Sequence, residues 1–219
     1  FSVLAPKVEQ FLRDKAFGTT VDLHSKLALQ ALNRPVVLHF TLKVFLRLLR
    51  PMLSEERTPV LSGELRKLST TFPFAWSGKI MQAHKTLFDF VPCDNDFEQD
   101  FARFLDAVPD VKAFANLGNL PAKLSIEYLD SEANLRLYEP DFIGLDENGT
   151  YWILETKGRE DIEVARKNLR AEQWCKDVAR LTGQGWQFLL VPQKEYDKLR
   201  AGSLAELVAG LNAGGVPFM

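Results

Sequence analysis

The spacing of apolar residues changes along the chain and predicts two regions. In the first region it mainly follows the helical repeat: KVEQFLRDKAF (residues 7–17) has apolar positions one helical turn apart, and HFTLKVFLRLLRPML (39–53) is strongly apolar until a proline near its end. The stretch LSTTFPFAWSGK (68–79) is interrupted by proline and glycine, which is typical of a loop. We therefore expect a mainly helical connector over residues 1–92.

Downstream of this connector the pattern is that of an α/β domain. Capping residues at 94–96 precede a helical repeat that ends before Pro109. Short strand-like runs follow, then a long polar-faced helix over about residues 160–182, a buried strand WQFLLVP and a last helix. This order predicts an α/β fold over residues 93–219, with a central mixed β-sheet flanked by helices.

The segment YEPDFIGLDENGTYWILETKG (138–158) predicts two strands joined by a tight turn. It is unusual because Asp141, Glu155 and Lys157 are charged where a half-buried hairpin ordinarily carries neutral residues. Side chains alternate along a strand, so Glu155 and Lys157 point to the same face, about 6.6 Å apart.

The length of the turn decides where Asp141 points. If residues 148–149 form a two-residue turn, the numbers of cross-strand partners sum to 297, and Asp141 lies opposite Thr156 and away from Glu155. A three-residue loop over residues 147–149, ending in a left-handed glycine, changes the sum to 296 and sets Asp141 opposite Glu155, with Cβ atoms about 5 Å apart. We predict the three-residue loop.

Two carboxylates at that separation repel each other unless a cation lies between them. Hard oxygen ligands suit Mg²⁺ or Mn²⁺. Metal-assisted phosphodiester hydrolysis uses such a set, because the metal activates a water and offsets charge on the phosphate. Lys157 is then placed to position that water or to stabilise the developing negative charge.

Composition adds limits to this interpretation. The chain has 219 residues, of which 46% are hydrophobic and 26% charged, an ordinary globular composition. It has no apolar run of the ~20 residues that a membrane span needs, no signal peptide and two cysteines, so we expect a cytoplasmic protein without membrane contact. A net charge of −2 is not typical of nucleic-acid binding, although a local basic patch is sufficient for it.

The sequence around the hairpin resembles a known nuclease superfamily. PD followed by ETK is similar to the motif of the PD-(D/E)xK nucleases. YEPDFIGL…YWILETKG, preceded by VPCDNDFEQDFARFL, resembles the C-terminal endonuclease region of type III restriction enzymes and related superfamily 2 helicase-nucleases. VLAPKVEQFLRDKAFG and PFAWSGK are similar to the region that connects motor and nuclease in that group. The resemblance implies a restriction-endonuclease-like core over residues 93–219.

The same resemblance implies roles for individual residues. Asp141 and Glu155 would be metal ligands, and Lys157 would be the catalytic lysine. Glu98 matches an acidic residue that many members add to the site, the alternative being a solvated first-turn acid favoured by the helix dipole. Gln173 matches a glutamine found in some branches, although the tyrosine that usually accompanies it is absent.

The implied activity is Mg²⁺-dependent endonucleolytic cleavage of double-stranded DNA to 5′-phosphate and 3′-hydroxyl ends, with Mn²⁺ as a substitute. The chain lacks a G-x-x-x-x-G-K-[ST] phosphate loop, so ATP would serve a helicase or translocase motor, expected upstream because the chain begins with Phe1 rather than Met. Other expected partners are a methyltransferase or specificity subunit and a second nuclease domain that cuts the other strand. Two alternatives are a non-catalytic nucleic-acid-binding or docking module of this fold and a repair or recombination nuclease.

Overall fold

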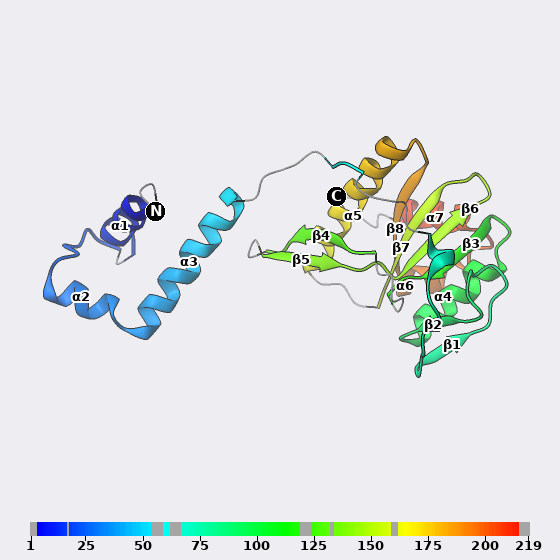
Figure 1. The fold of residues 1–219 in the computed structure, drawn as a ribbon, viewed down its shortest axis with the longest axis horizontal. Helices are drawn as coiled ribbons and strands as arrows, with labels where there is room; N and C mark the ends of the chain where they lie inside the picture. Colours follow the sequence, from blue (N-terminus) through cyan, green and yellow to red (C-terminus); the bar gives the residue numbers. More distant parts are fainter. Residues whose placement is uncertain are drawn as a thin grey trace. The chain divides into compact units, whose positions relative to one another are not determined.

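The computed structural model shows a protein of mixed α/β class (Figure 1). It describes residues 4–16, 18–53, 59–61, 67–118, 124–131, 134–158 and 162–214. The chain divides into two compact units, Phe1–Arg57 with Glu132–Asn134 and Thr58–Ser131 with Leu135–Met219. The division after Arg57 differs from the predicted boundary at residue 92, because residues 58–92 group with the sheet rather than with the helical connector.

The first unit is helical, as the apolar repeat predicted. It contains α1 (Leu4–Asp14), α2 (Lys26–Leu32) and α3 (Pro35–Leu53). The Ser25 hydroxyl accepts a hydrogen bond from the Ala28 backbone N–H at 3.2 Å, which caps the start of α2. Phe11 of α1 and Phe45 of α3 make an edge-to-face contact with ring centroids 5.0 Å apart.

The second unit is built around a four-stranded mixed sheet, in agreement with the predicted sheet type. Its strand order is β3 (Val111–Asn116), β6 (Phe142–Asp146), β7 (Tyr151–Lys157) and β8 (Trp186–Pro192). β6 pairs antiparallel with both β3 and β7, and β8 runs parallel to β7. Two small antiparallel sheets accompany it: β1 (Lys79–Met81) with β2 (Val91–Cys93), and β4 (Ile126–Leu129) with β5 (Leu135–Tyr138).

Helices cover both faces of the central sheet. These helices are α4 (Asp96–Ala107), α5 (Ile162–Thr182), α6 (Gln193–Leu199) and α7 (Leu204–Ala213), and a 3₁₀ turn, Leu68–Thr70, precedes β1. Phe142 and Leu154, which are cross-strand partners, pack into the core with α4 and α7. Ile153, the next residue of β7, packs instead with Ala171 of α5. The strands therefore alternate between two separate apolar cores, as a sheet buried on both faces requires.

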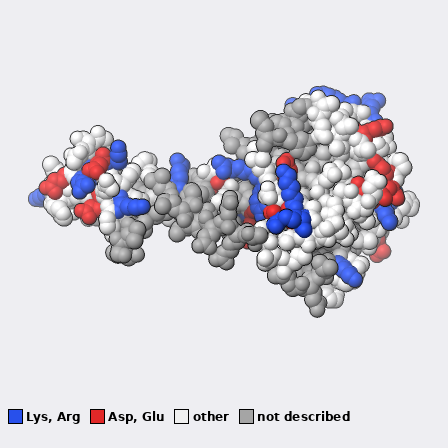
Figure 2. All heavy atoms as spheres, turned by 90° about the horizontal axis from the view of Figure 1, so that it is seen from above, with Lys and Arg blue, Asp and Glu red and all other residues white. Residues whose placement is uncertain are grey.

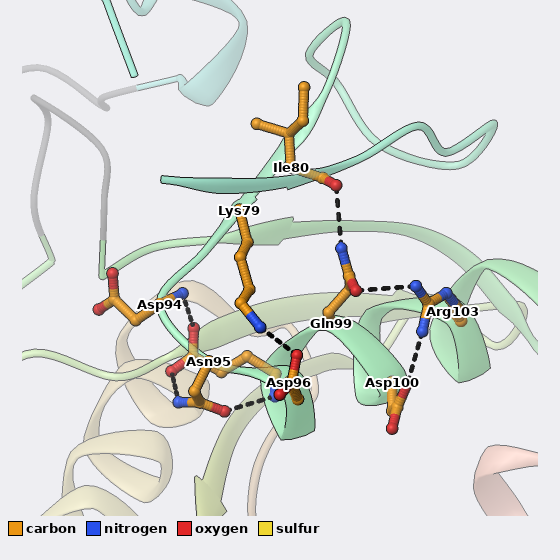
Figure 3. Close-up of polar contacts among 9 residues, drawn as sticks. Lys79, Ile80, Asp94, Asn95, Asp96, Gln99, Asp100 and Arg103 are labelled. Atoms are coloured by element: carbon orange, nitrogen blue, oxygen red, sulfur yellow. Dashed lines mark hydrogen bonds and ion pairs between the residues drawn. The ribbon is translucent and has the colours of Figure 1, made fainter. Parts of the chain in front are cut away.

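Polar contacts attach β1 to the start of α4 (Figure 3). Lys79 forms an ion pair with Asp96, and the Gln99 side-chain amide donates to the Ile80 carbonyl at 3.0 Å. Gln99 in turn accepts from Arg103 at 2.8 Å. These contacts explain why the β1 region belongs to the second unit, although its loop-like sequence suggested a connector.

The hairpin between β6 and β7 confirms the predicted three-residue loop. The partner numbers sum to 296 in every pair from Phe142↔Leu154 to Leu145↔Tyr151. Gly149, the last residue of the loop, has φ +84°, which is the left-handed conformation that glycine adopts without strain. This register continues toward Asp141 and Glu155 at the far end of the hairpin.

The Asp146 carboxylate holds this turn together and provides a first prediction. It accepts hydrogen bonds from the backbone N–H of Asn148 at 2.9 Å and of Thr150 at 2.8 Å, and from the indole N–H of Trp152 at 3.0 Å. We expect Asp146→Ala to lower the free energy of unfolding by about 3 kcal/mol, since it leaves a buried indole N–H without an acceptor. Urea unfolding would measure the loss.

Glu147→Ala is the matched control for this prediction. Glu147 lies in the same turn, but its side chain is exposed. We expect its free energy of unfolding to stay within about 0.5 kcal/mol of the parent. A loss below about 1 kcal/mol for Asp146→Ala would show that the carboxylate does not fix the turn.

Candidate active site

The candidate site lies where the hairpin ends opposite its turn. Asp141 immediately precedes β6, whose register with β7 starts at the pair Phe142↔Leu154. Asp141 and Glu155 are the residues that adjoin this pair at the end of the hairpin. The Asp141 carboxylate accepts hydrogen bonds from the Thr156 backbone N–H at 2.8 Å and from the Thr156 hydroxyl at 2.6 Å. These two bonds hold the Asp141 carboxylate against the end of β7, at the residue next to Glu155.

Glu155 is buried, with 6% of its surface exposed, and both of its carboxylate oxygens have partners. The Tyr138 hydroxyl donates to Oε2 at 2.8 Å. The Lys167 ammonium of α5 lies 3.4 Å from Oε1 and 4.5 Å from the centroid of the Tyr138 ring. Glu155 therefore sits between a strand residue and a helix residue that the sequence analysis did not assign to the site.

Lys157 ends β7, where it is half-buried. Within the described residues its ammonium makes no hydrogen bond or ion pair. Its charge nevertheless acts to lower the pKa of both Asp141 and Glu155, so it belongs to the same electrostatic environment. Lys157 is thus a cation near the Asp141 and Glu155 carboxylates that forms an ion pair with neither of them.

Glu98 reaches this region from the first turn of α4 (Figure 3 shows its neighbours Asp94 and Asn95). The Asn95 side chain caps the helix by accepting from the Glu98 backbone N–H at 2.9 Å. The Glu98 carboxylate accepts in return from the Asp94 backbone N–H at 2.9 Å and from the Asn95 side-chain amide at 2.6 Å. Glu98 is only 7% exposed, so the alternative of a solvated first-turn acid is wrong, although its capping role is real.

Asn116 of β3 links Glu98 to the sheet. Its side-chain amide lies 3.5 Å from Glu98 Oε2, and the residue is 2% exposed. Its carbonyl oxygen, Oδ1, is buried without a hydrogen-bond partner in the described part of the chain. Buried amide oxygens ordinarily have a partner, so this one points to a water molecule or a ligand.

Burial raises the pKa of all three acidic side chains, and the charge of Asp141 raises the pKa of Glu155 and Glu98 further. Burial raises the pKa of Glu155 to about 7, and the charge of Asp141 adds to this effect. Burial also raises the pKa of Asp141, against the opposing hydrogen bonds from Thr156. The pKa of Glu98 is raised by burial and then by the charge of Asp141. Asp141 therefore influences the other two, which identifies the three as one cluster.

The raised pKa of Glu155 predicts how stability depends on pH. Its folded pKa of about 7 lies above the ordinary value of 4.5, so the folded state holds an extra proton between these values. This contribution is complete below pH 4.5 and is lost as the pH rises through 7, with a total of about 3 kcal/mol. We expect the stability of the metal-free protein to fall over this window more steeply than that of Glu155→Gln.

Other acidic groups also titrate, so the comparison must be made by difference. Urea unfolding of the two proteins between pH 4 and 8, in the presence of a chelator, would give the contribution of Glu155 alone. Parallel pH curves for the two proteins would contradict the prediction.

Gln173 does not join the cluster. Its side chain is exposed and donates to Asp177 at 3.2 Å on the same helix. The helix turns Ala171 and Cys175 into the core, and Lys167, one turn before Ala171, shares their side. Gln173 lies between these positions in sequence and therefore points away. The sequence signal that could have identified Lys167 is its spacing of four residues from Ala171 and of eight from Cys175.

The oxygen donors of the cluster fit a hard divalent cation in chemical type. Three carboxylates and the unpartnered Asn116 Oδ1 are the ligands that Mg²⁺ and Mn²⁺ prefer. Among the residues that the structure describes, however, no group of three or more His, Cys, Asp or Glu side chains is arranged to hold a metal ion.

Basic residues around α5 are mostly paired with acidic groups. Arg170 donates to the Glu127 carbonyl at 3.0 Å and lies 4.0 Å from Asp177, and Arg180 lies 3.7 Å from Asp177. Figure 2 shows Lys and Arg side chains gathered beside acidic ones on the face in view, rather than as a continuous basic surface. This distribution agrees with the small net charge of −2.

Within the described ranges, no helix combines the length and apolarity needed to cross a membrane. Comparisons of the chain with protein-family models, with curated proteins and with solved structures found no match.

Proposed function

We propose that the second unit is a metal-dependent endonuclease that hydrolyses phosphodiester bonds in double-stranded DNA, with a core like that of the restriction endonucleases. The observation that supports the proposal is the hairpin register. Continued one residue beyond the pair Phe142↔Leu154, this register would set Asp141 opposite Glu155, with Lys157 two residues further along β7. An ordinary structural hairpin has no need for a buried Glu155 beside a half-buried Asp141, since their burial and repulsion cost stability.

The chain's own residues then have distinct roles. Asp141 and Glu155 would hold Mg²⁺ or Mn²⁺, and Glu98 and Asn116 would complete or orient this oxygen set. The bound ion would supply Lewis-acid chemistry, polarising a water molecule and offsetting charge on the phosphate. Lys157, which has no protein anion bound to it in the described structure, would contact the phosphate and stabilise the negative charge that develops there.

The reaction forms one bond and breaks one bond. The oxygen of a water molecule bonds to phosphorus, and the bond from phosphorus to the 3′ oxygen breaks. The water proton leaves to solvent, and the 3′ oxygen takes up a proton, which gives 5′-phosphate and 3′-hydroxyl ends. Hydrogen bonds from Tyr138 to Glu155 and from Thr156 to Asp141 keep the two carboxylates in place while charge builds up.

The resemblance to type III restriction enzymes extends the proposal to a larger assembly. We place the nuclease in an ATP-dependent helicase-nuclease, with a motor that uses ATP, a methyltransferase or specificity subunit as partner, and a cytoplasmic location. Because one site cuts one strand, two such domains would act together to break a duplex.

Nicking of supercoiled plasmid by the purified chain is the direct test. We expect conversion to the open circular form with Mg²⁺ or Mn²⁺, and no conversion with a chelator. Products should be ligatable, since the 5′ end keeps its phosphate. No cleavage with either metal, combined with no heat of metal binding in calorimetry, would instead favour a non-catalytic docking module.

A further inference from the structure

Lys167 forms an ion pair with the Glu155 carboxylate, and the proposed nuclease chemistry gives this lysine no role. Its ammonium is 3.4 Å from Glu155 Oε1 and 4.5 Å from the ring centroid of Tyr138, whose hydroxyl donates to the other oxygen of Glu155. Each of these three side chains, which come from α5, β7 and β5, contacts the other two. The Lys167 side chain is 23% exposed and that of Glu155 is 7% exposed.

The charge of this cluster explains why a lysine is there. Asp141 and Glu155 lie at the same end of the hairpin, and the charge of Lys167 acts to lower the pKa of both carboxyls. Two buried carboxylates without a nearby cation are strongly unfavourable. Lys167 thus supplies one positive charge beside Glu155, where a bound divalent ion would supply two.

Lys167 and a metal ion cannot both hold Glu155 Oε1 without repelling each other. The separation of 3.4 Å is longer than the 2.7–2.9 Å typical of a charged N–H···O hydrogen bond, so the contact is weaker than an ideal one. Lysine has a flexible four-carbon stem, and its partial exposure gives the ammonium a route to solvent.

We propose that Lys167 is a stand-in for the metal ion: it neutralises Glu155 in the metal-free protein and moves away when the metal binds, so that it lowers the affinity of the site for metal. The inference rests on the proposed metal site. In this role Lys167 is a positioning residue that keeps the site folded without metal. Lys157 differs because its ammonium makes no ion pair with Glu155.

Isothermal titration calorimetry with Mn²⁺ tests this without measuring cleavage. We expect Lys167→Met to bind Mn²⁺ about tenfold more tightly than the parent, because the competing cation is gone. Lys176→Met is the matched control: Lys176 is an exposed lysine on the same helix, and its removal changes the net charge equally. We expect its Mn²⁺ affinity to stay within about twofold of the parent.

Thermal unfolding gives a second readout. Without metal, Lys167→Met should melt several degrees below the parent, since Glu155 loses its cation, and saturating Mn²⁺ should remove most of this difference. If Lys167→Met does not fold, Lys167→Gln, which keeps a hydrogen-bond donor but not the charge, takes its place with the same expectations.

The outcomes distinguish this inference from the proposed function. Equal or weaker Mn²⁺ binding by the Lys167 variant, with clear binding by the parent, overturns the stand-in role and leaves the nuclease proposal intact. No Mn²⁺ binding by the parent, even with a DNA duplex present, overturns both.

Discussion

Replacing Asp141 with asparagine is expected to abolish metal-dependent DNA cleavage without weakening the fold. Asparagine keeps a side-chain oxygen that can accept the two hydrogen bonds from Thr156. The Asp141 carboxylate accepts these bonds from the Thr156 hydroxyl at 2.6 Å and from its backbone N–H at 2.8 Å. It removes the negative charge that acts on Glu155 and Glu98. We therefore expect the metal-free variant to be as stable as the parent or about 1 kcal/mol more stable.

The loss of activity should be large, because the variant lacks one of the two carboxylates that we propose as metal ligands. We expect nicking to fall at least about 1000-fold, which corresponds to about 4 kcal/mol of transition-state stabilisation. Plasmid nicking, Mn²⁺ calorimetry and urea unfolding of the same samples would check the three parts of this prediction.

Asp94→Asn is the control for this substitution, because the Asp94 side chain is exposed. The substitution leaves unchanged the backbone N–H of residue 94, which donates a hydrogen bond to Glu98. We expect it to cleave within about twofold of the parent. Full activity of Asp141→Asn would place the metal elsewhere and remove the observation on which the proposed function rests.

Lys157→Met should give the second large effect, with a different signature. Methionine keeps much of the aliphatic bulk of lysine and removes the charge that the proposal brings to the phosphate. We expect cleavage to fall about 1000-fold, while Mn²⁺ affinity stays within about threefold of the parent, because Lys157 forms no ion pair with the carboxylates in the described structure. Single-turnover cleavage at saturating metal would measure the first quantity and calorimetry the second.

Lys112→Met provides the comparison, because Lys112 is an exposed lysine on β3 of the same sheet. It should cleave like the parent. A Lys157 variant that loses metal affinity and activity in equal measure would indicate that this lysine shapes the site rather than acting on DNA.

Features that depend on neighbouring residues in the sequence could be predicted. The left-handed Gly149 and the three-residue loop fixed the hairpin register from Leu145↔Tyr151 to Phe142↔Leu154. The mixed sheet also followed from the order of the elements. In these cases the decisive physics is local: turn geometry and the alternation of side chains along a strand.

Features that depend on how distant elements pack could not be predicted. The rotation of α5 about its axis is set by the core around Ala171 and Cys175, and this rotation turns Lys167 inward and Gln173 outward. The partnership of Tyr138 with Glu155 requires β5 to end beside β7, which no local pattern specifies. Residues 58–92 group with the sheet rather than with the first helices, and the contact of β1 with α4 that contributes to this grouping is likewise non-local.

The parallel pairing of β7 with β8 has a consequence for the order of folding. The β6–β7 hairpin is local in sequence, but β8 can join β7 only after α5 has crossed between them. Before that crossing, pairing of β6 with β7 would bring the two acids together while neither Lys167 nor the apolar face of α5 is in place. We therefore expect the hairpin to remain loosely formed until α5 docks, so that completion of the acidic site and closure of the second core occur as a single late step.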